Sequence, residues 1–168
     1  MGMLFSCSND LEEVKSLDTE QEEGLVTTYS DVQLSYTDSA ILQSKVQAGR
    51  LKQFSGKDER SEFDNGVIMK FYEDGIIQTV LKANKVIKRD KIKAMEAFGN
   101  VILTNINGEE LSTEHLIYNE EDEKISTQEM VKITRNQEIL WGEGMVSNAT
   151  FTQYNIKKVK SQIPMKDE

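Results

Sequence analysis

The chain has 168 residues, of which 38% are apolar and 29% are charged, and this size and composition suit one soluble globular domain. Its net charge of −9 repels phosphate backbones and anionic lipid surfaces, which argues against nucleic acid as a partner. No run of residues approaches the roughly 20 consecutive apolar positions that a membrane-spanning helix needs, so the sequence as written is not predicted to cross a bilayer.

The first residues, MGMLFSC at 1–7, have the form of a bacterial lipobox. Leu4 is the apolar residue at position −3, Ser6 is the small residue at −1, and Cys7 is the single cysteine of the chain. The basic and apolar regions of a secretory signal do not precede this pattern. We therefore interpret residues 1–7 as a lipobox remnant with Cys7 as the lipidation site, or alternatively as a cloning scar around an incidental thiol.

Residues 8–24 follow as a strongly acidic segment. Its sequence, SNDLEEVKSLDTEQEEG, holds seven carboxylates and one lysine and so carries −6 of the net charge. Such a segment has too few apolar residues to offset the entropy of ordering it, which predicts a flexible, solvated tether. A short amphipathic helix that uses Leu11, Val14 and Leu17 is the alternative.

Period-2 alternation dominates the next part of the chain and predicts a nearly all-β fold. Strands of about 6 to 8 residues are expected between the turn signals Asn65-Gly66, Asp74-Gly75, Asn107-Gly108 and the charged stretch 120–123. Residues 45–60 are expected to form a loop, and residues 164–168 a disordered C-terminus in which Pro164 ends the strand pairing.

The strands also recur as a larger unit. Similar runs begin at Val67, Val101 and Val131, and each is followed by a turn and a second strand. Short repeats of this kind cannot bury their apolar faces alone and must stack. The expected fold is therefore an elongated array of antiparallel strands with open edges, because a closed barrel would leave no edges.

Six segments of the chain share a characteristic order and spacing: TTYSDVQLSYTDSAILQ at 27–43, EFDNGVIMKFYEDG at 62–75, GNVILTNINGEELSTEHLIY at 99–118, EKIST at 123–127, VKIT at 131–134 and ILWGEG at 139–144. In this order they resemble the LptC family of lipopolysaccharide export, in a form similar to that of Bacteroidetes, and the resemblance covers about residues 25–163. It implies an OstA-like twisted β-jellyroll in the periplasm, attached to the inner membrane.

The resemblance further implies a lipid-transfer function without enzymatic chemistry. Such a protein accepts lipopolysaccharide from an inner-membrane ABC transporter with LptF/LptG-type subunits and passes it to LptA along the apolar interior of the jellyroll. The alternation of the sequence places the following expected lipid-binding residues on one inward face: Val67, Met69, Phe71, Leu81, Ala83, Val101, Leu103, Leu111, Val131 and Ile133. The expected partner edge strands contain Leu25, Val26 and Thr27 at one end and Tyr154, Ile156 and Val159 at the other.

Several alternatives stay open at this stage. The inward residues could fill a closed core, and the protein could be an elongated scaffold or adhesion lipoprotein that binds proteins through its edge strands. Soluble LptA shares the fold, but the tether and Cys7 argue against it. Lys157, Lys158 and Lys160 could bind lipid phosphates or the acidic groups of a partner, or they could protect an edge against aggregation.

Little in the sequence supports a catalytic function. His115 is the single histidine, and we expect it to face solvent or a neighbouring strand. There is no cluster of cysteine and histidine for a metal and no glycine-rich phosphate loop between a strand and a helix. We therefore expect a protein that is not an enzyme and uses no cofactor.

Overall fold

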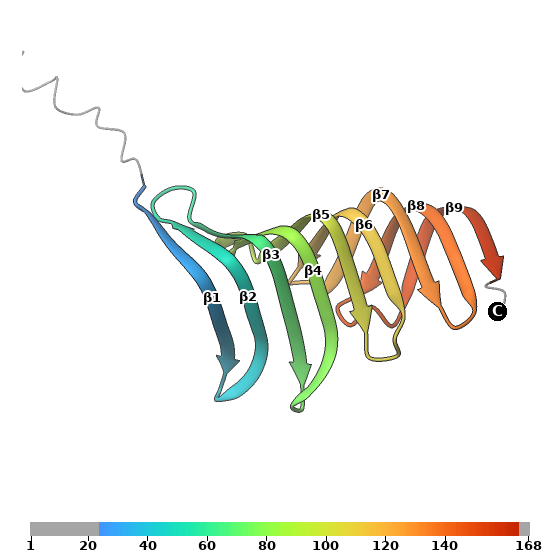
Figure 1. The fold of residues 1–168 in the computed structure, drawn as a ribbon, viewed down its shortest axis with the longest axis horizontal. Coiled ribbons are helices and arrows are strands. Elements are labelled where there is room, and N and C mark those ends of the chain that lie inside the picture. Colours follow the sequence, from blue (N-terminus) through green and yellow to red (C-terminus); the bar gives the residue numbers. More distant parts are fainter. Residues whose placement is uncertain (1–23, 165–168) are drawn as a thin grey trace, which may run out of the picture.

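The computed structural model describes residues 24–164, which form one antiparallel sheet of nine strands in the order of the sequence (Figure 1). The strands are β1 (Val26–Asp38), β2 (Ile41–Phe54), β3 (Arg60–Glu73), β4 (Ile76–Arg89), β5 (Ala94–Asn105), β6 (Glu110–Asn119), β7 (Lys124–Arg135), β8 (Glu138–Asn148) and β9 (Tyr154–Pro164). The lipobox with Cys7, nearly all of the acidic tether and residues 165–168 lie outside this part of the chain.

The predicted all-β class and the open edges are confirmed. Strands β1 and β9 lie at opposite ends of the sheet and each pairs on one side with its sequence neighbour (Figure 1). The helical element η1 (Asp90–Ile92) is a single 3-10 turn between β4 and β5. Within residues 24–164, no helix is long and apolar enough to span a membrane.

Three expectations about the strands were wrong. The strands are 10 to 14 residues long, longer than predicted. Asn65-Gly66 does not form a hairpin turn but a bulge inside β3, where both residues have positive φ. Most of the expected loop at 45–60 belongs to β2, and the real connection to β3 is the short segment 55–59. All three errors have one cause, because a bulge lets a strand continue where the alternation breaks.

Bulges lie near the middle of almost every strand and divide the sheet into two arms. The register shifts at Gln47/Arg50, Asp64/Val67, Lys82/Lys85, Phe98/Val101, Ser112/Ile117, Thr127/Met130 and Trp141/Gly142 follow one line across the sheet. Bulges bend strands and increase their twist. We call residues 32–47, 67–82, 101–112, 130–141 and 161–164 arm A, and residues 26–30, 50–64, 85–98, 117–127 and 142–159 arm B.

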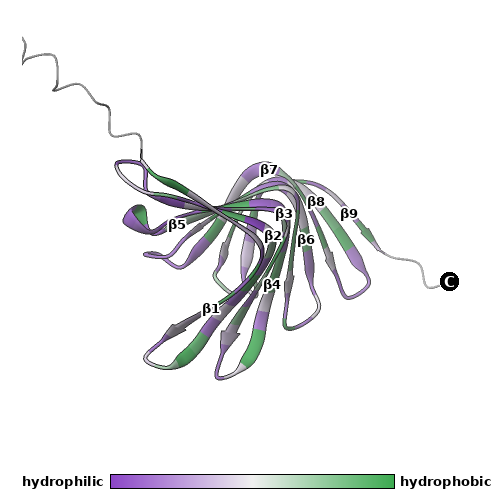
Figure 2. Ribbon diagram, turned by 60° about the vertical axis from the view of Figure 1, so that its left-hand side comes forward, coloured by the Kyte–Doolittle hydropathy of each residue, from purple (hydrophilic) through white to green (hydrophobic). Residues whose placement is uncertain are grey.

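The two arms fold over one another (Figure 2), and strands β2 to β8 contribute buried side chains to both walls of the interior. The ammonium of Lys88 on arm B lies 5.6 Å from the ring centre of Tyr36 on arm A. The hydroxyl of Thr79 on arm A lies 3.4 Å from the carbonyl oxygen of Thr150, in the β8–β9 connection. Partners across the interior are therefore several strands apart in the sequence.

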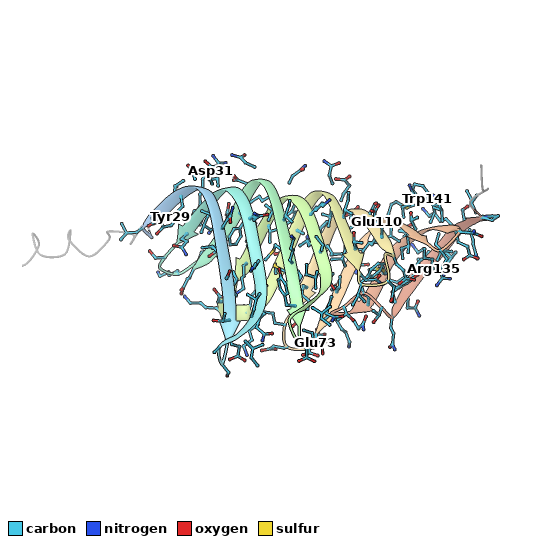
Figure 3. The ribbon with its side chains drawn as sticks, turned by 60° about the horizontal axis from the view of Figure 1, so that its bottom comes forward. Tyr29, Asp31, Glu73, Glu110, Arg135 and Trp141 are labelled. Atoms are coloured by element: carbon cyan, nitrogen blue, oxygen red, sulfur yellow. The ribbon has the colours of Figure 1, made fainter. Side chains whose placement is uncertain are left out.

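A single apolar cluster fills much of the space between the arms. It draws on both arms and on the β8–β9 connection, and its members are Val46, Ala48, Leu51, Phe63, Val67, Met69, Leu81, Ala83, Val86, Met95, Ala97, Val101, Leu103, Leu111, Leu116, Ile125, Val131, Ile133, Leu140, Met145 and Phe151. Charged side chains project from the outside of the sheet, as the sticks in Figure 3 show around Asp31. Burial of this cluster is the main force that holds the arms together.

Candidate functional site

A cleft of about 510 Å³ opens between the arms near the middle of the sheet. Arm A supplies Phe71 from β3, Leu81 from β4 and Leu103 from β5, while arm B supplies Met95, Tyr118 and Ile125 from β5, β6 and β7. The remaining lining residues are Gln43, Ser44, Tyr72, Glu73, Gln78, Thr79, Glu120, Glu123, Ala149 and Thr150. The cleft thus has apolar walls and a polar rim, which is the usual composition of a site for an apolar ligand.

The sequence-predicted inward residues divide into two groups. Phe71, Leu81 and Leu103 line the cleft, and Phe71 is only half-buried there. The others are buried away from the cleft lining, within the closed part of the apolar cluster: Val67, Met69, Ala83, Val101, Leu111, Val131 and Ile133. Lipid binding by these ten residues stays a prediction. The cleft directs that prediction to Phe71, Leu81 and Leu103, which line it.

The arm B wall of the cleft was missed by sequence reasoning. Met95, Tyr118 and Ile125 lie on half-strands whose alternation is readable, since Met95, Ala97 and Ile125 are all buried. The missing information was which half-strands face one another across the interior. That pairing depends on the bend of every strand and has no local signature in the sequence.

The rim of the cleft is acidic. Glu73 is the last residue of β3, and Glu120 and Glu123 lie in the β6–β7 turn. No lysine or arginine belongs to the cleft lining within the part of the chain that the structure describes. Burial raises the pKa of the Tyr118 hydroxyl, and the nearby charges of Glu120, Glu123 and Asp122 raise it further. The sequence indicates only that Glu120 and Glu123 lie in a solvated turn, whereas the fold brings them to the same opening as Glu73.

The two edge strands differ in what they expose. On β1 and just before it, the predicted edge residues Leu25, Val26 and Thr27 are all exposed, Leu25 by 80%. On β9, Val159 is 64% exposed, but Tyr154 and Ile156 point inward and pack against the apolar cluster. A partner strand at β9 would therefore meet the backbone of Tyr154 and Ile156 and the side chain of Val159.

The lysines of β9 are partly engaged within the protein. The amines of Lys158 and Lys160 each lie 3.2 Å from a carboxylate oxygen of Glu143 on β8, and Lys157 donates to Gln128 at 3.0 Å. Both lysines of the pair lower the pKa of Glu143, Lys160 first. The predicted alternatives for this cluster, edge protection and binding of acidic groups, are both compatible with this arrangement.

His115 contacts a neighbouring strand. Its Nε2 lies 3.2 Å from a carboxylate oxygen of Glu96, and its ring stacks on Phe98 with the centroids 4.6 Å apart. Both partners are on β5. Among residues 24–164, no group of three or more acidic, histidine or cysteine side chains is placed to hold a metal ion.

Comparison with known proteins identifies one family. The family model described as "Lipopolysaccharide-assembly, LptC-related" matches residues 3–163, which include every strand of the sheet. A search of the curated proteins finds no match.

Proposed function

The chain belongs to the LptC-related family of lipopolysaccharide assembly, and from this premise we propose that it is a lipid-transfer protein whose cleft holds acyl chains of lipopolysaccharide. Membership in the family implies a role in lipopolysaccharide assembly or transport at the cell envelope. Members of the family are transport components and not enzymes. The particular ligand site, the partners and the membrane anchor are our proposals.

The cleft between the arms carries the proposal. An acyl chain that leaves water for apolar walls such as Leu81, Leu103 and Ile125 gains about 0.8 kcal/mol per methylene. A carrier must also release its ligand, and the half-buried Phe71 and Tyr118 leave the cleft partly open to solvent. Apolar walls with an open mouth suit reversible binding better than permanent burial.

The open edges of the sheet support a direction of transfer. In our proposal, β1 receives a strand of the inner-membrane ABC transporter (LptF/LptG-type subunits), and β9 offers its free edge to LptA. Exposed edge strands bind partners by adding a strand to the sheet. Within residues 24–164, β1 and β9 each have a neighbouring strand on one side only, and the exposed Leu25 and Val159 lie at opposite ends of the sheet. Lipidation of Cys7 would tether the protein to the inner membrane and keep β1 near the transporter.

Equilibrium binding of radiolabelled lipopolysaccharide to the purified full chain tests the proposal. We expect saturable binding that is weakened by Leu103→Phe, because the larger ring occupies the cleft. Ile102→Phe is the matched control, since residue 102 is the next position on β5 and lies outside the lining. Thermal melting checks that both variants are folded. Absence of saturable binding would contradict the proposal and favour the scaffold function.

A further inference from the structure

The connection between β8 and β9 forms a strap across the interior. We define the strap as residues 148–153, and at its centre Phe151 is fully buried in the apolar cluster. Phe151 has a φ of 53°, a left-handed conformation that bulky residues rarely adopt. Residues persist in such conformations only where their surroundings hold them there, and they are frequent at functional sites.

Asn105, at the end of β5, holds the strap against arm A. Its side-chain amide donates one hydrogen bond to the carbonyl oxygen of Phe151 at 2.8 Å and another to the carboxylate of Glu109 at 2.7 Å. Its side-chain oxygen accepts from the backbone N–H groups of Asn107 and Glu109 at 2.9 and 3.0 Å. Every polar atom of this buried amide has a partner, so its orientation is fixed.

Further hydrogen bonds keep the strap folded. The side-chain oxygen of Asn148 accepts from the backbone N–H groups of Thr152 and Gln153 at 2.9 and 3.0 Å. The hydroxyl of Thr79 reaches the carbonyl oxygen of Thr150 at 3.4 Å. The strap is therefore tied to arm A at two consecutive residues, Thr150 and Phe151.

The strap contributes to the cleft lining. Ala149 and Thr150 line the cleft, and the next residue in the chain is the fully buried Phe151. The Phe151 ring stacks on Tyr154 with the centroids 5.1 Å apart. Tyr154 and Ile156 are the first residues of β9 that pack against the apolar cluster, so the aromatic pair joins the strap to the part of the interior next to β9.

We propose that the strap is the end wall of the cleft and that Phe151 determines how far a bound acyl chain reaches toward β9. The inference rests on the proposed function, because it concerns the same cleft and the same ligand. In the resting protein a chain stops at Thr150 and Phe151. Passage to the β9 edge requires the strap to leave arm A, which means breaking the hydrogen bonds of Asn105 and Thr79.

Site-specific photo-crosslinking of the purified full chain to lipopolysaccharide, with no partner protein present, tests the end wall. A photoreactive residue at Leu103 that is about as large as leucine, and so does not fill the cleft, reports on the cleft, and one at the half-buried Ile156 reports on the interior behind the wall. In the otherwise unchanged protein we expect adducts at position 103 and few at 156. With Phe151→Ala, the ratio of adducts at 156 to those at 103 should rise several-fold.

Two further variants show whether a change in the adduct ratio comes from loss of the end wall or from general loosening of the core. Phe63→Ala removes an equally buried ring from arm B of β3, far from the strap in sequence, and should leave the ratio unchanged. Asn105→Ala keeps Phe151 but releases its carbonyl oxygen, and should raise the ratio.

The outcomes distinguish the inference from the proposed function. Adducts at 103 in every protein, with a ratio that neither Phe151→Ala nor Asn105→Ala changes, would overturn the end wall alone. An equal rise with Phe63→Ala would also overturn it. No adducts at 103 in any protein would overturn both the end wall and the proposed function.

Discussion

Glu62 on β3 and Lys85 on β4 form an ion pair 2.8 Å long on arm B. The other carboxylate oxygen of Glu62 accepts a hydrogen bond from Arg60 at 2.7 Å, and the Glu62 side chain is only 12% exposed. Burial alone would raise the pKa of Glu62, but the hydrogen bonds from Lys85 and Arg60 outweigh it and lower the pKa. Two cations thus hold one carboxylate in its charged form next to the bend of β3.

The lowered pKa predicts a stability term that acid removes. A carboxyl whose pKa is lower in the folded state than in the unfolded state stabilises the fold above its ordinary pKa of about 4.3, and this stabilisation is lost as the pH falls through the folded-state pKa. Glu62→Gln should therefore reduce the free energy of unfolding at pH 7 by about 1–2 kcal/mol. Denaturant unfolding of both proteins should show the difference shrinking as the pH is lowered below 4.3, and a constant difference would contradict this account.

Gly142 is predicted to control the attachment of β9. A methyl group on Gly142 would meet the side chain of Ile156 and would lie 2.9 Å from the carbonyl oxygen of Lys158, both on the neighbouring strand. Gly142→Ala should cost about 1–3 kcal/mol through overpacking. Hydrogen exchange should accelerate in β9 more than in β2, and Ile156→Ala added to Gly142→Ala should restore part of the melting temperature. Unchanged exchange in β9 would show that the contact is not tight.

The acidic rim of the cleft should weaken binding of the phosphorylated lipid. Glu120 and Glu123 repel phosphate groups at the opening, and salt screens that repulsion. We expect the affinity for lipopolysaccharide to rise with ionic strength, and the double variant Glu120→Gln, Glu123→Gln to bind more tightly by about two- to thirtyfold, since exposed charges contribute about 0.2–1 kcal/mol each. Glu129→Gln, at an exposed position of β7 outside the lining, is the control and should bind as the unchanged protein does. Binding that weakens with salt would mean that the rim does not act on the phosphates.

The β9 edge is predicted to be the docking site for LptA. Val159→Asp should weaken association with LptA by about 1–2 kcal/mol, as expected for a charge placed in an apolar contact. Folding stability should stay within about 0.5 kcal/mol, because Val159 is 64% exposed. Ile76→Asp, at a residue that is 57% exposed near the β3–β4 turn, is the matched control. Equal losses of binding in the two variants would argue against docking at β9.

Much of the fold could be predicted because alternation is a local signal. Val67, Val101 and Val131 lie at or next to the start of the arm A half-strands of β3, β5 and β7, and all three are buried. Asn107-Gly108 lies in the hairpin turn between β5 and β6, as predicted. That signal is also local, because an Asn-Gly pair readily adopts the positive φ that a tight turn needs. The Asn65-Gly66 pair carries the same local signal but forms a bulge, because its strand partners continue on both sides.

The site could be predicted only in part. The period of the sequence separates the inward Leu103 from the outward Ile102, but it treats Leu103 and Val101 alike. Leu103 lines the cleft and Val101 is enclosed in the core. This difference depends on which half-strand of the other arm lies opposite each residue. Phe151 had no strand pattern around it, and its burial depends on Asn105, 46 residues away in the sequence.

Photo-crosslinking in living cells tests the central claim most directly. Photoreactive residues at Phe71 and Leu103 probe the cleft, one at Val131 probes the enclosed core, and one at the outward Lys132 is the control. We predict lipopolysaccharide adducts at Phe71 and Leu103, and none at Val131 or Lys132. Absence of adducts at Phe71 and Leu103, in protein shown to be folded and exported, would contradict the account and would mean that the cleft does not carry lipid.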